Sequence, residues 1–102
     1  MKLSPTPNTD HEVMYDDYHS LVWIEWVEDS PYLHATNRSH VCKATLQEAR
    51  KRLASIKGEM CCRGASGLRC IVSPDLLPFA KTFGFAPSMY LADGNTMMFQ
   101  EV

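Results

Sequence analysis

The thiol and imidazole groups that could hold a metal ion or act as nucleophiles are scattered along this chain. The four cysteines are Cys42, Cys61, Cys62 and Cys70, and no two of them have the C-x-x-C spacing of a zinc site. His40 and Cys42 could supply two ligands, but no second pair is spaced to complete a tetrahedral set. We therefore expect no metal site and reduced cysteine side chains.

Aromatic and basic side chains form a second group with possible roles. Trp23, Trp26 and Tyr32 lie close together in the sequence, where they either pack in a core or groove, the commoner outcome, or form a partner-binding patch. The basic run 50–52 is typical of a solvated helix face, because the net charge of −2 argues against a nucleic-acid groove. None of the four histidines has a serine or cysteine partner at the spacing of a catalytic triad, so we expect surface positions for them.

Length and composition indicate one small domain. The chain has 102 residues, so residues 1–102 are expected to form a single α/β domain with one core. Hydrophobic residues make up 45% and charged residues 22%, which favours a globular protein over a disordered one. The longest apolar run, 21–24, is far too short for a membrane span, and the N-terminus lacks a signal-peptide stretch. We expect a protein that is neither secreted nor bound to membranes or nucleic acid.

The N-terminal half predicts mainly strands. Pro5 and Pro7 indicate a loop over 4–8. Residues 19–28 place apolar side chains on both faces of one extended segment, which is typical of a strand covered in part on both sides. The other elements expected here are a strand over 1–4, a short helix over 11–18 capped by Thr9 or Asp10, a turn at 29–31, and two shorter strands over 32–35 and 39–43 about a turn at 36–38.

The clearest local signal is a helix over 45–60. Thr45 and Glu48 have the spacing of a capping box, in which each side chain satisfies a backbone N–H of the other residue. One apolar stripe recurs at steps of three and four, and Gly58 is expected to begin the unwinding of the helix. The stripe consists of Leu46, Ala49, Leu53, Ile56 and Met60.

The C-terminal half predicts a strand, a helix and a hairpin. Asp75 is the expected cap of the helix, because Pro78 then falls in the first turn, and Gly84 ends it. Asp93-Gly94 is a strong signal for a two-residue hairpin turn. The expected elements are a strand over 68–72, a helix over 75–83, and strands over 89–92 and 96–101.

This order of elements resembles the GNAT acetyltransferase superfamily over nearly the whole chain. Residues 1–10 are similar to that family's first strand and the acidic residue that starts its first helix, and 45–60 occupy the place of its central helix. Residues 71–85, which end in Gly84-Phe85, resemble the strand, helix and closing Gly-Phe of a later family motif. The resemblance implies an α/β (α+β) fold with a mixed, mostly antiparallel sheet, two main helices and a C-terminal β-hairpin.

The segment that would hold the family's cofactor departs from the family pattern. GNAT enzymes bind the pyrophosphate of coenzyme A with a glycine-rich loop at the N-terminus of the central helix, where backbone N–H groups approach the phosphates. The matching residues here include no glycine, and a serine stands where an asparagine often begins the later helix. If acetyl-CoA binds, the candidate contacts are Val41, Cys42, Lys43, Ala44, Thr45 and Ser73. The glycines of 63–67 follow the central helix instead and indicate a turn.

The family's proton donor is also missing. A tyrosine about four residues before the Gly-Phe pair usually protonates the departing thiolate, and this chain has Ala80 there, which has no proton to donate. Tyr90 or Cys70 could substitute for it. Glu25 or Glu28 could be the general base that deprotonates an acceptor amine, although solvent-facing carboxylates are the commoner interpretation.

These departures determine the function that we expect from the sequence. Only one short helix fits between Asp10 and His19, where GNAT enzymes usually carry two helices that form a wall of the acceptor site. The run 9–13 and the glycine-free entry to the central helix resemble small, degenerate GNAT-like proteins of tailed bacteriophages, some of which are internal virion or head-assembly components. The resemblance implies a non-catalytic protein without a cofactor that docks on a protein partner or viral particle, in the host cytoplasm or the virion. The alternatives are a minimal acetyl-CoA-dependent N-acetyltransferase and a small phage-encoded inhibitor of a host protein.

Overall fold

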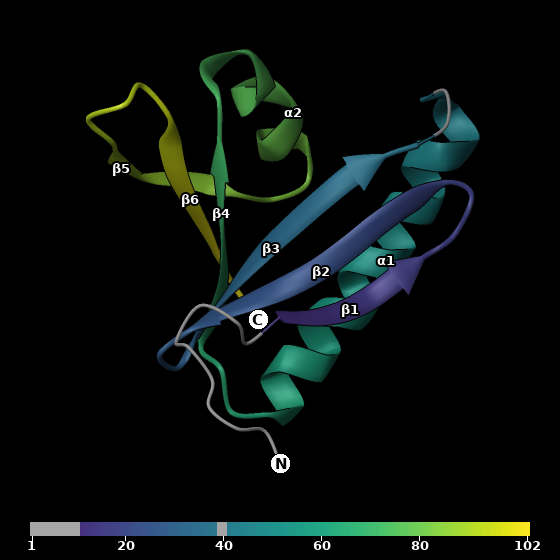
Figure 1. The fold of residues 1–102 in the computed structure, drawn as a ribbon, viewed down its shortest axis with the longest axis horizontal. Helices are drawn as coiled ribbons and strands as arrows, with labels where there is room; N and C mark the ends of the chain where they lie inside the picture. Colours follow the sequence, from purple (N-terminus) through teal and green to yellow (C-terminus); the bar gives the residue numbers. More distant parts are fainter. Residues whose placement is uncertain (1–10, 39–40) are drawn as a thin grey trace.

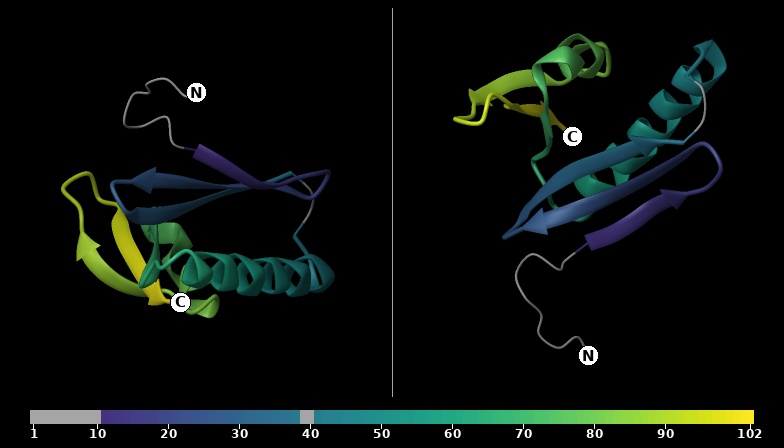
Figure 2. Two further views of the ribbon diagram at one scale, coloured as in Figure 1. Left: turned by 90° about the horizontal axis from the view of Figure 1, so that it is seen from below. Right: turned by 45° about the horizontal axis from the view of Figure 1, so that its top comes forward.

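Two α-helices lie against one face of a six-stranded sheet in the computed structural model, which describes residues 11–38 and 41–102 (Figures 1 and 2). The strand order is β1-β2-β3-β4-β6-β5, and only the β3–β4 pair is parallel. The mixed, mostly antiparallel sheet with two helices and a C-terminal hairpin is thereby confirmed. The elements are β1 (His11–Asp16), β2 (Ser20–Val27), β3 (Ser30–Asn37), α1 (Lys43–Cys62), β4 (Gly67–Val72), a 3-10 turn (Pro74–Leu76), α2 (Leu77–Thr82), β5 (Ala86–Tyr90) and β6 (Thr96–Glu101).

The first described element is a strand, so the helix predicted over 11–18 is wrong. β1 pairs antiparallel with β2 and forms one edge of the sheet. In this position its backbone finds hydrogen-bond partners, and Met14 and Tyr15 pack against the core, whereas so short a helix is marginal by itself. The predicted strand over 1–4, the loop over 4–8 and the caps Thr9 and Asp10 lie outside the described residues.

The structure confirms the strand predicted over 19–28 as β2, but β3 is longer than predicted. The strand predicted over 32–35 lies inside β3 and is confirmed, but β3 continues to Asn37, so the turn predicted at 36–38 is wrong. The strand predicted over 39–43 is wrong for residues 41–43, the part of it that the structure describes. The β2–β3 turn is Glu28-Asp29, with Glu28 at a φ of +57°, and it therefore begins one residue before the predicted turn. Residues 39 and 40 lie outside the described residues, and Lys43 already belongs to α1.

Helix α1 confirms the predicted central helix and extends it at both ends. Its N-cap is Cys42, and the Thr45 hydroxyl accepts a hydrogen bond from the Cys42 N–H (2.7 Å) and donates one to the Cys42 carbonyl (2.9 Å). The capping box predicted for Thr45 and Glu48 is therefore wrong, because the helix starts earlier. Gly58 continues the helix, since the packed stripe outweighs the modest cost of one interior glycine. Of that stripe, Leu53, Ile56 and Met60 are buried, and Leu46 and Ala49 are half-buried.

The core lies between the two helices and the sheet face that they cover. Ile24 of β2, Met60 of α1, Leu68 of β4 and Met98 of β6 are completely buried there. Ala80 brings α2 into the same cluster, so both helices share one core. The opposite face of the sheet has no covering helix among the described residues (Figure 2).

The C-terminal elements follow the predicted order. β4 and the β5–β6 hairpin are confirmed, although β5 runs from Ala86 to Tyr90 instead of over 89–92. The connection around Asp93-Gly94 spans residues 91–95, so the predicted two-residue turn is wrong. Gly84 ends α2 with a φ of +95°, a conformation that favours glycine. Asp75 does not cap α2 as predicted: it accepts a hydrogen bond from the Ser73 hydroxyl (2.5 Å) in the 3-10 turn, and the N-cap is Leu76.

Candidate ligand site between strands β3 and β4

Strands β3 and β4 meet near the start of β3 and then part (Figure 1). In the described part of the chain, the ladder between them consists of one pair, Tyr32 opposite Arg69. Beyond that pair β3 runs on to Asn37 and β4 to Val72 without pairing to each other. Backbone N–H and C=O groups on the β4 side of β3 therefore lack a strand partner, and a ligand with amide groups could pair with them as an added strand does.

A cleft of about 350 Å³ lies where these strands part. Its volume is within the range of about 300–1,000 Å³ that is usual for small-ligand sites. Leu53 and Ile56 of α1 and Ala80 of α2 line it with buried apolar groups, while Leu76 and Phe79 border it and remain 48% and 43% exposed. This lining suits an extended ligand that is largely aliphatic.

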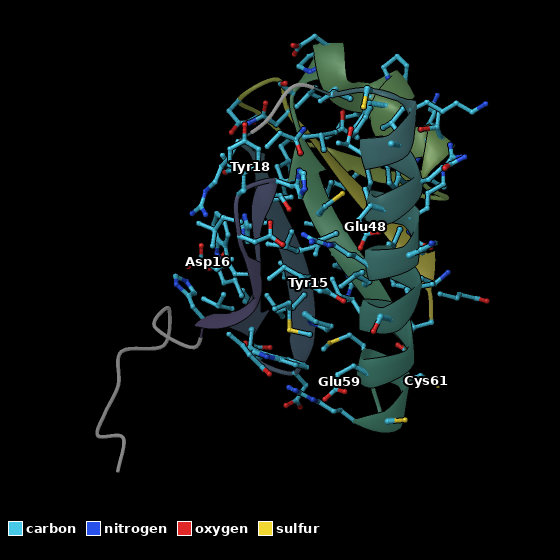
Figure 3. The ribbon with its side chains drawn as sticks, turned by 90° about the vertical axis from the view of Figure 1, so that its right-hand side faces the viewer. Tyr15, Asp16, Tyr18, Glu48, Glu59 and Cys61 are labelled. Atoms are coloured by element: carbon cyan, nitrogen blue, oxygen red, sulfur yellow. The ribbon has the colours of Figure 1, made fainter. Side chains whose placement is uncertain are left out.

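Arg52 of α1 brings a positive charge to the cleft lining. Its guanidinium lies 2.5 Å from the Asp17 carboxylate and 3.5 Å from Glu48, and it donates a hydrogen bond to the Ser20 hydroxyl (3.0 Å). The Arg52 guanidinium also lies over the ring of Tyr15. Figure 3 shows Tyr15 between β1 and α1. The hydrogen bond from Arg52 lowers the pKa of Asp17 to about 2. With its charge balanced by two carboxylates, Arg52 joins α1 to the β1–β2 turn and is not suited to hold an anion.

A histidine and a glutamate pair on the sheet face opposite the helices. His34 of β3 lines the cleft, and its Nε2–H donates a hydrogen bond to Glu25 Oε1 of β2 at 2.8 Å. The imidazole also stacks on Trp23, with ring centroids 5.0 Å apart and planes 12° apart. Sequence reasoning placed Glu25 among the candidates but set His34 aside with the other histidines, because none of them has a serine or cysteine partner at the spacing of a catalytic triad. A turn at Glu28-Asp29 sets Trp23 opposite His34, and Glu25 follows two residues along the same face.

The three aromatic residues predicted as a partner-binding patch lie on two different faces of the sheet. Trp23 and Tyr32 are on the face away from the helices, in register with His34 and Glu25. Trp26 packs against the core on the helix face, with the guanidinium of Arg63 5.9 Å from its ring centroid. The three side chains therefore do not form one surface, and a partner-binding role for any of them stays a prediction.

The predicted cofactor-binding segment is the exposed N-terminus of α1. Its first turn contains no acidic residue and includes Lys43, so a negatively charged group could approach the helix end. Three donors hydrogen-bond to Cys42 Sγ and lower the pKa of that thiol. In order of decreasing effect they are the Thr45 N–H, the Thr45 hydroxyl and the Ala44 N–H. A phosphate would have to share or displace these contacts. We therefore expect this segment to bind a phosphate group more weakly than a glycine-rich loop would.

The candidate proton donors do not converge on one point. Tyr90 is 73% exposed on the edge strand β5 and is not part of the cleft lining. Cys70 lines the cleft, but burial raises its pKa to about 11, so it is a weaker acid than an ordinary thiol. Ala80 is buried in the lining. The Ser73 hydroxyl donates a hydrogen bond to the Asp75 carboxylate.

The cysteines are free thiols, three of them exposed and Cys70 buried. Over residues 11–38 and 41–102, no three His, Cys, Asp or Glu side chains are grouped so that they could hold a metal ion. In the same residues, no helix has the length and apolar character needed to cross a membrane.

Comparison with known proteins supports the fold that the geometry indicates. Neither a scan against protein-family models nor a search of curated proteins gives a match. Among solved structures, the chain is similar to the crystal structure of a proposed acetyltransferase from Agrobacterium tumefaciens, with a TM-score of 0.57 and 18% sequence identity. The match covers 93% of this chain and 78% of that one. On this evidence of shape, and on the order of its strands and helices, the chain has a GNAT-like fold.

Proposed function

We propose that this protein binds an acyl thioester of coenzyme A in the cleft between β3 and β4 and transfers the acyl group to an amine. The observation that carries the proposal is the parting of the two strands beyond Tyr32 and Arg69, over a mostly apolar cleft. The proposed function differs from the cofactor-free docking role expected from the sequence. The reason is that residue types alone predict neither the cleft nor the unpaired strand edge.

The cleft suits the pantetheine arm of coenzyme A in two respects. The aliphatic parts of the arm can lie against Leu53, Ile56 and Ala80. Its amide groups can pair with the β3 backbone between Leu33 and Asn37, which β4 leaves unpaired. Both interactions use apolar side chains and backbone, so they do not require a distinctive residue motif.

The N-terminus of α1 is the part of the chain suited to the phosphate groups. A helix of 20 residues presents its positive end there, beside Lys43 and without an acidic residue in the first turn. Residues 41–45 include no glycine, and Cys42 Sγ already uses first-turn donors. We therefore expect coenzyme A to bind here more weakly than to a glycine-rich loop.

A thioester cofactor supplies an acyl carbon that an amine can attack, and the residues at the cleft hold the reacting groups and move protons. Cys70 is a poor proton donor because burial raises its pKa to about 11, and Tyr90 is not part of the cleft lining. The departing sulfur would therefore take its proton from solvent. We expect slow acyl transfer as a result.

The second candidate is the docking role itself, on a protein partner such as a viral particle. The observation that favours it is the sheet face opposite the helices, which no described helix covers. Val13, Val27 and Ile71 are 58%, 45% and 44% exposed on that face. Co-purification with one defined protein, together with no response to coenzyme A, would favour docking over catalysis.

Thermal unfolding of the purified protein with acetyl-CoA tests the proposal. A ligand at 100 times its Kd stabilises the folded state by about 2.7 kcal/mol, so we expect a clear rise in Tm. Ala35→Trp fills the cleft from the β3 edge and should abolish the rise. Thr36→Trp is the matched control, because it is the next residue of the same strand and faces the other side of the sheet. No rise in the wild type, or an undiminished rise in A35W, contradicts the proposal.

A further inference from the structure

We infer that His34 is the general base of the proposed transfer, taking the proton that the attacking amine loses, and that Glu25 is a positioning residue for His34. This inference rests on the proposed function, but it also makes a claim about the imidazole that can be measured without any cofactor. It reassigns the role of Glu25, which the sequence alone suggests as a base.

The register of β2 and β3 brings the two side chains together. Trp23 and His34 are direct cross-strand partners, so they share one face of the sheet, and Glu25 lies two residues further along that face. The 2.8 Å hydrogen bond from His34 to Glu25 and the stacked Trp23 ring hold the imidazole from two directions. Neither contact depends on a mobile loop, since both partners are in β2.

The hydrogen bond determines which imidazole nitrogen can act as a base. A carboxylate only accepts hydrogen bonds, so Nε2 of His34 carries the proton that Glu25 binds. Nδ1 is then the nitrogen with the free lone pair. Among residues 11–38 and 41–102, no other side chain hydrogen-bonds to this ring. Nδ1 is therefore available to accept a proton from a ligand.

Position at the cleft favours His34 over both carboxylates. His34 is part of the cleft lining, whereas Glu25 is not and holds His34 with one of its oxygens. Glu28 lies in the exposed β2–β3 turn, also outside the lining. A base must come within hydrogen-bond reach of the proton that it removes, and of these three residues His34 alone borders the ligand space.

The charged and titratable groups around His34 come from four strands. Glu25 faces it from β2, and His11 of β1 is the cross-strand partner of Glu25. Tyr32 precedes it on the same face of β3, opposite Arg69 of β4. The Arg69 guanidinium is directed toward the Ser30 hydroxyl (3.3 Å) and the Phe99 ring, so the carboxylate is the direct partner of the imidazole.

The proposed transfer replaces the C–S bond of the thioester by an N–C bond. An N–C bond forms between the amine and the acyl carbon, the C–S bond breaks, the amine proton goes to His34 Nδ1, and the released thiolate takes a proton from water. His34 then returns its proton to solvent, which leaves the protein unchanged. The exposed sheet face beside Trp23 and His34 is where the amine would approach.

Two variants and one control test the assignment, with acetyl-CoA and a peptide that has a free α-amino group as substrates. We expect His34→Gln to lower kcat by about 10²- to 10⁴-fold while the Tm rise with acetyl-CoA is kept. Glu25→Ala should lower kcat less, by about tenfold, and change its pH profile. Glu28→Ala removes a carboxylate from the neighbouring turn and should leave both quantities at wild-type values.

Nitrogen NMR of the imidazole gives a readout that a purely structural role would not change. In the ligand-free wild type we expect His34 in the Nε2-protonated tautomer, and in E25A a mixture of the two tautomers. A wild type that binds acetyl-CoA and acetylates the peptide, with H34Q equally fast, overturns the base assignment alone. An Nδ1-protonated tautomer in the wild type overturns it as well. Absence of any Tm rise or transfer in the wild type overturns the proposed function, and the base assignment with it.

Discussion

The guanidinium of Arg52 lies 2.5 Å from the carboxylate of Asp17, and this ion pair joins the middle of α1 to the turn between β1 and β2. The Arg52 side chain is only 14% exposed and also lies over Tyr15, 4.5 Å from the ring centroid. Because Arg52 also lines the cleft, the pair fixes the distance between the helix and the β1–β2 hairpin on one side of the ligand space.

The Arg52–Asp17 pair predicts a specific dependence of stability on pH. Arg52 lowers the pKa of Asp17 from 3.8 to about 2, so the unfolded chain binds this proton before the folded one does. The pair therefore stabilises the fold above about pH 4, and this contribution is lost as the pH falls toward about 2. We expect Asp17→Asn to flatten the fall in the urea midpoint over this range. Asp29→Asn, in the exposed β2–β3 turn, is the control, and identical slopes in D17N and wild type would refute the assignment.

Much of the fold could be predicted because its signals are local. The apolar stripe from Leu46 to Met60 has the helical period, and Asp93-Gly94 marks the position of the hairpin connection, although not its length. β1 could not be predicted in this way, because its strand conformation depends on pairing with β2, which is a tertiary contact. The early start of α1 could not be predicted either, because Thr45 can serve either as the cap or as the third residue inside the helix.

The candidate site was harder to predict than the fold. Glu25 and the α1 N-terminus could be named from residue types, but the His34–Glu25 pair requires the exact β2–β3 register. A turn placed one residue late puts His34 on the opposite face relative to Trp23. The cleft itself depends on where β3 and β4 stop pairing, and no residue pattern in either strand marks that point.

Buried and exposed methionines should differ sharply in their effect on stability. Met60 and Met98 are completely buried where α1 meets the sheet, so we expect Met→Ala at either position to cost about 2–5 kcal/mol of unfolding free energy. Met89 is 55% exposed on β5, and Met89→Ala should change it by less than about 0.5 kcal/mol. Denaturant unfolding of the three variants measures these differences. Similar costs at all three positions would contradict the core described above.

The cysteines should react with iodoacetamide in a fixed order. Cys42 is exposed and hydrogen bonds lower its pKa, so it should be alkylated near neutral pH before Cys70, whose pKa burial raises to about 11. Thr45→Val removes the hydroxyl that contacts Cys42 Sγ and should slow its alkylation. Peptide mass spectrometry at successive times measures both rates. Alkylation of Cys70 as fast as that of Cys42 in the folded protein would be incompatible with the buried position of Cys70.

The two ends of the proposed cofactor can be tested separately at the α1 N-terminus. Ala44→Trp places a bulky side chain at the exposed first turn, so it should weaken acetyl-CoA binding by about tenfold, or about 1.4 kcal/mol. It should not weaken binding of S-acetylpantetheine, which has the arm but lacks the nucleotide phosphates. Ala92→Trp, exposed in the β5–β6 turn, is the control, and isothermal titration calorimetry measures all six affinities for the wild type and the two variants. Equal loss of both ligands would mean that A44W distorts the cleft, and equal retention would place the phosphates away from α1.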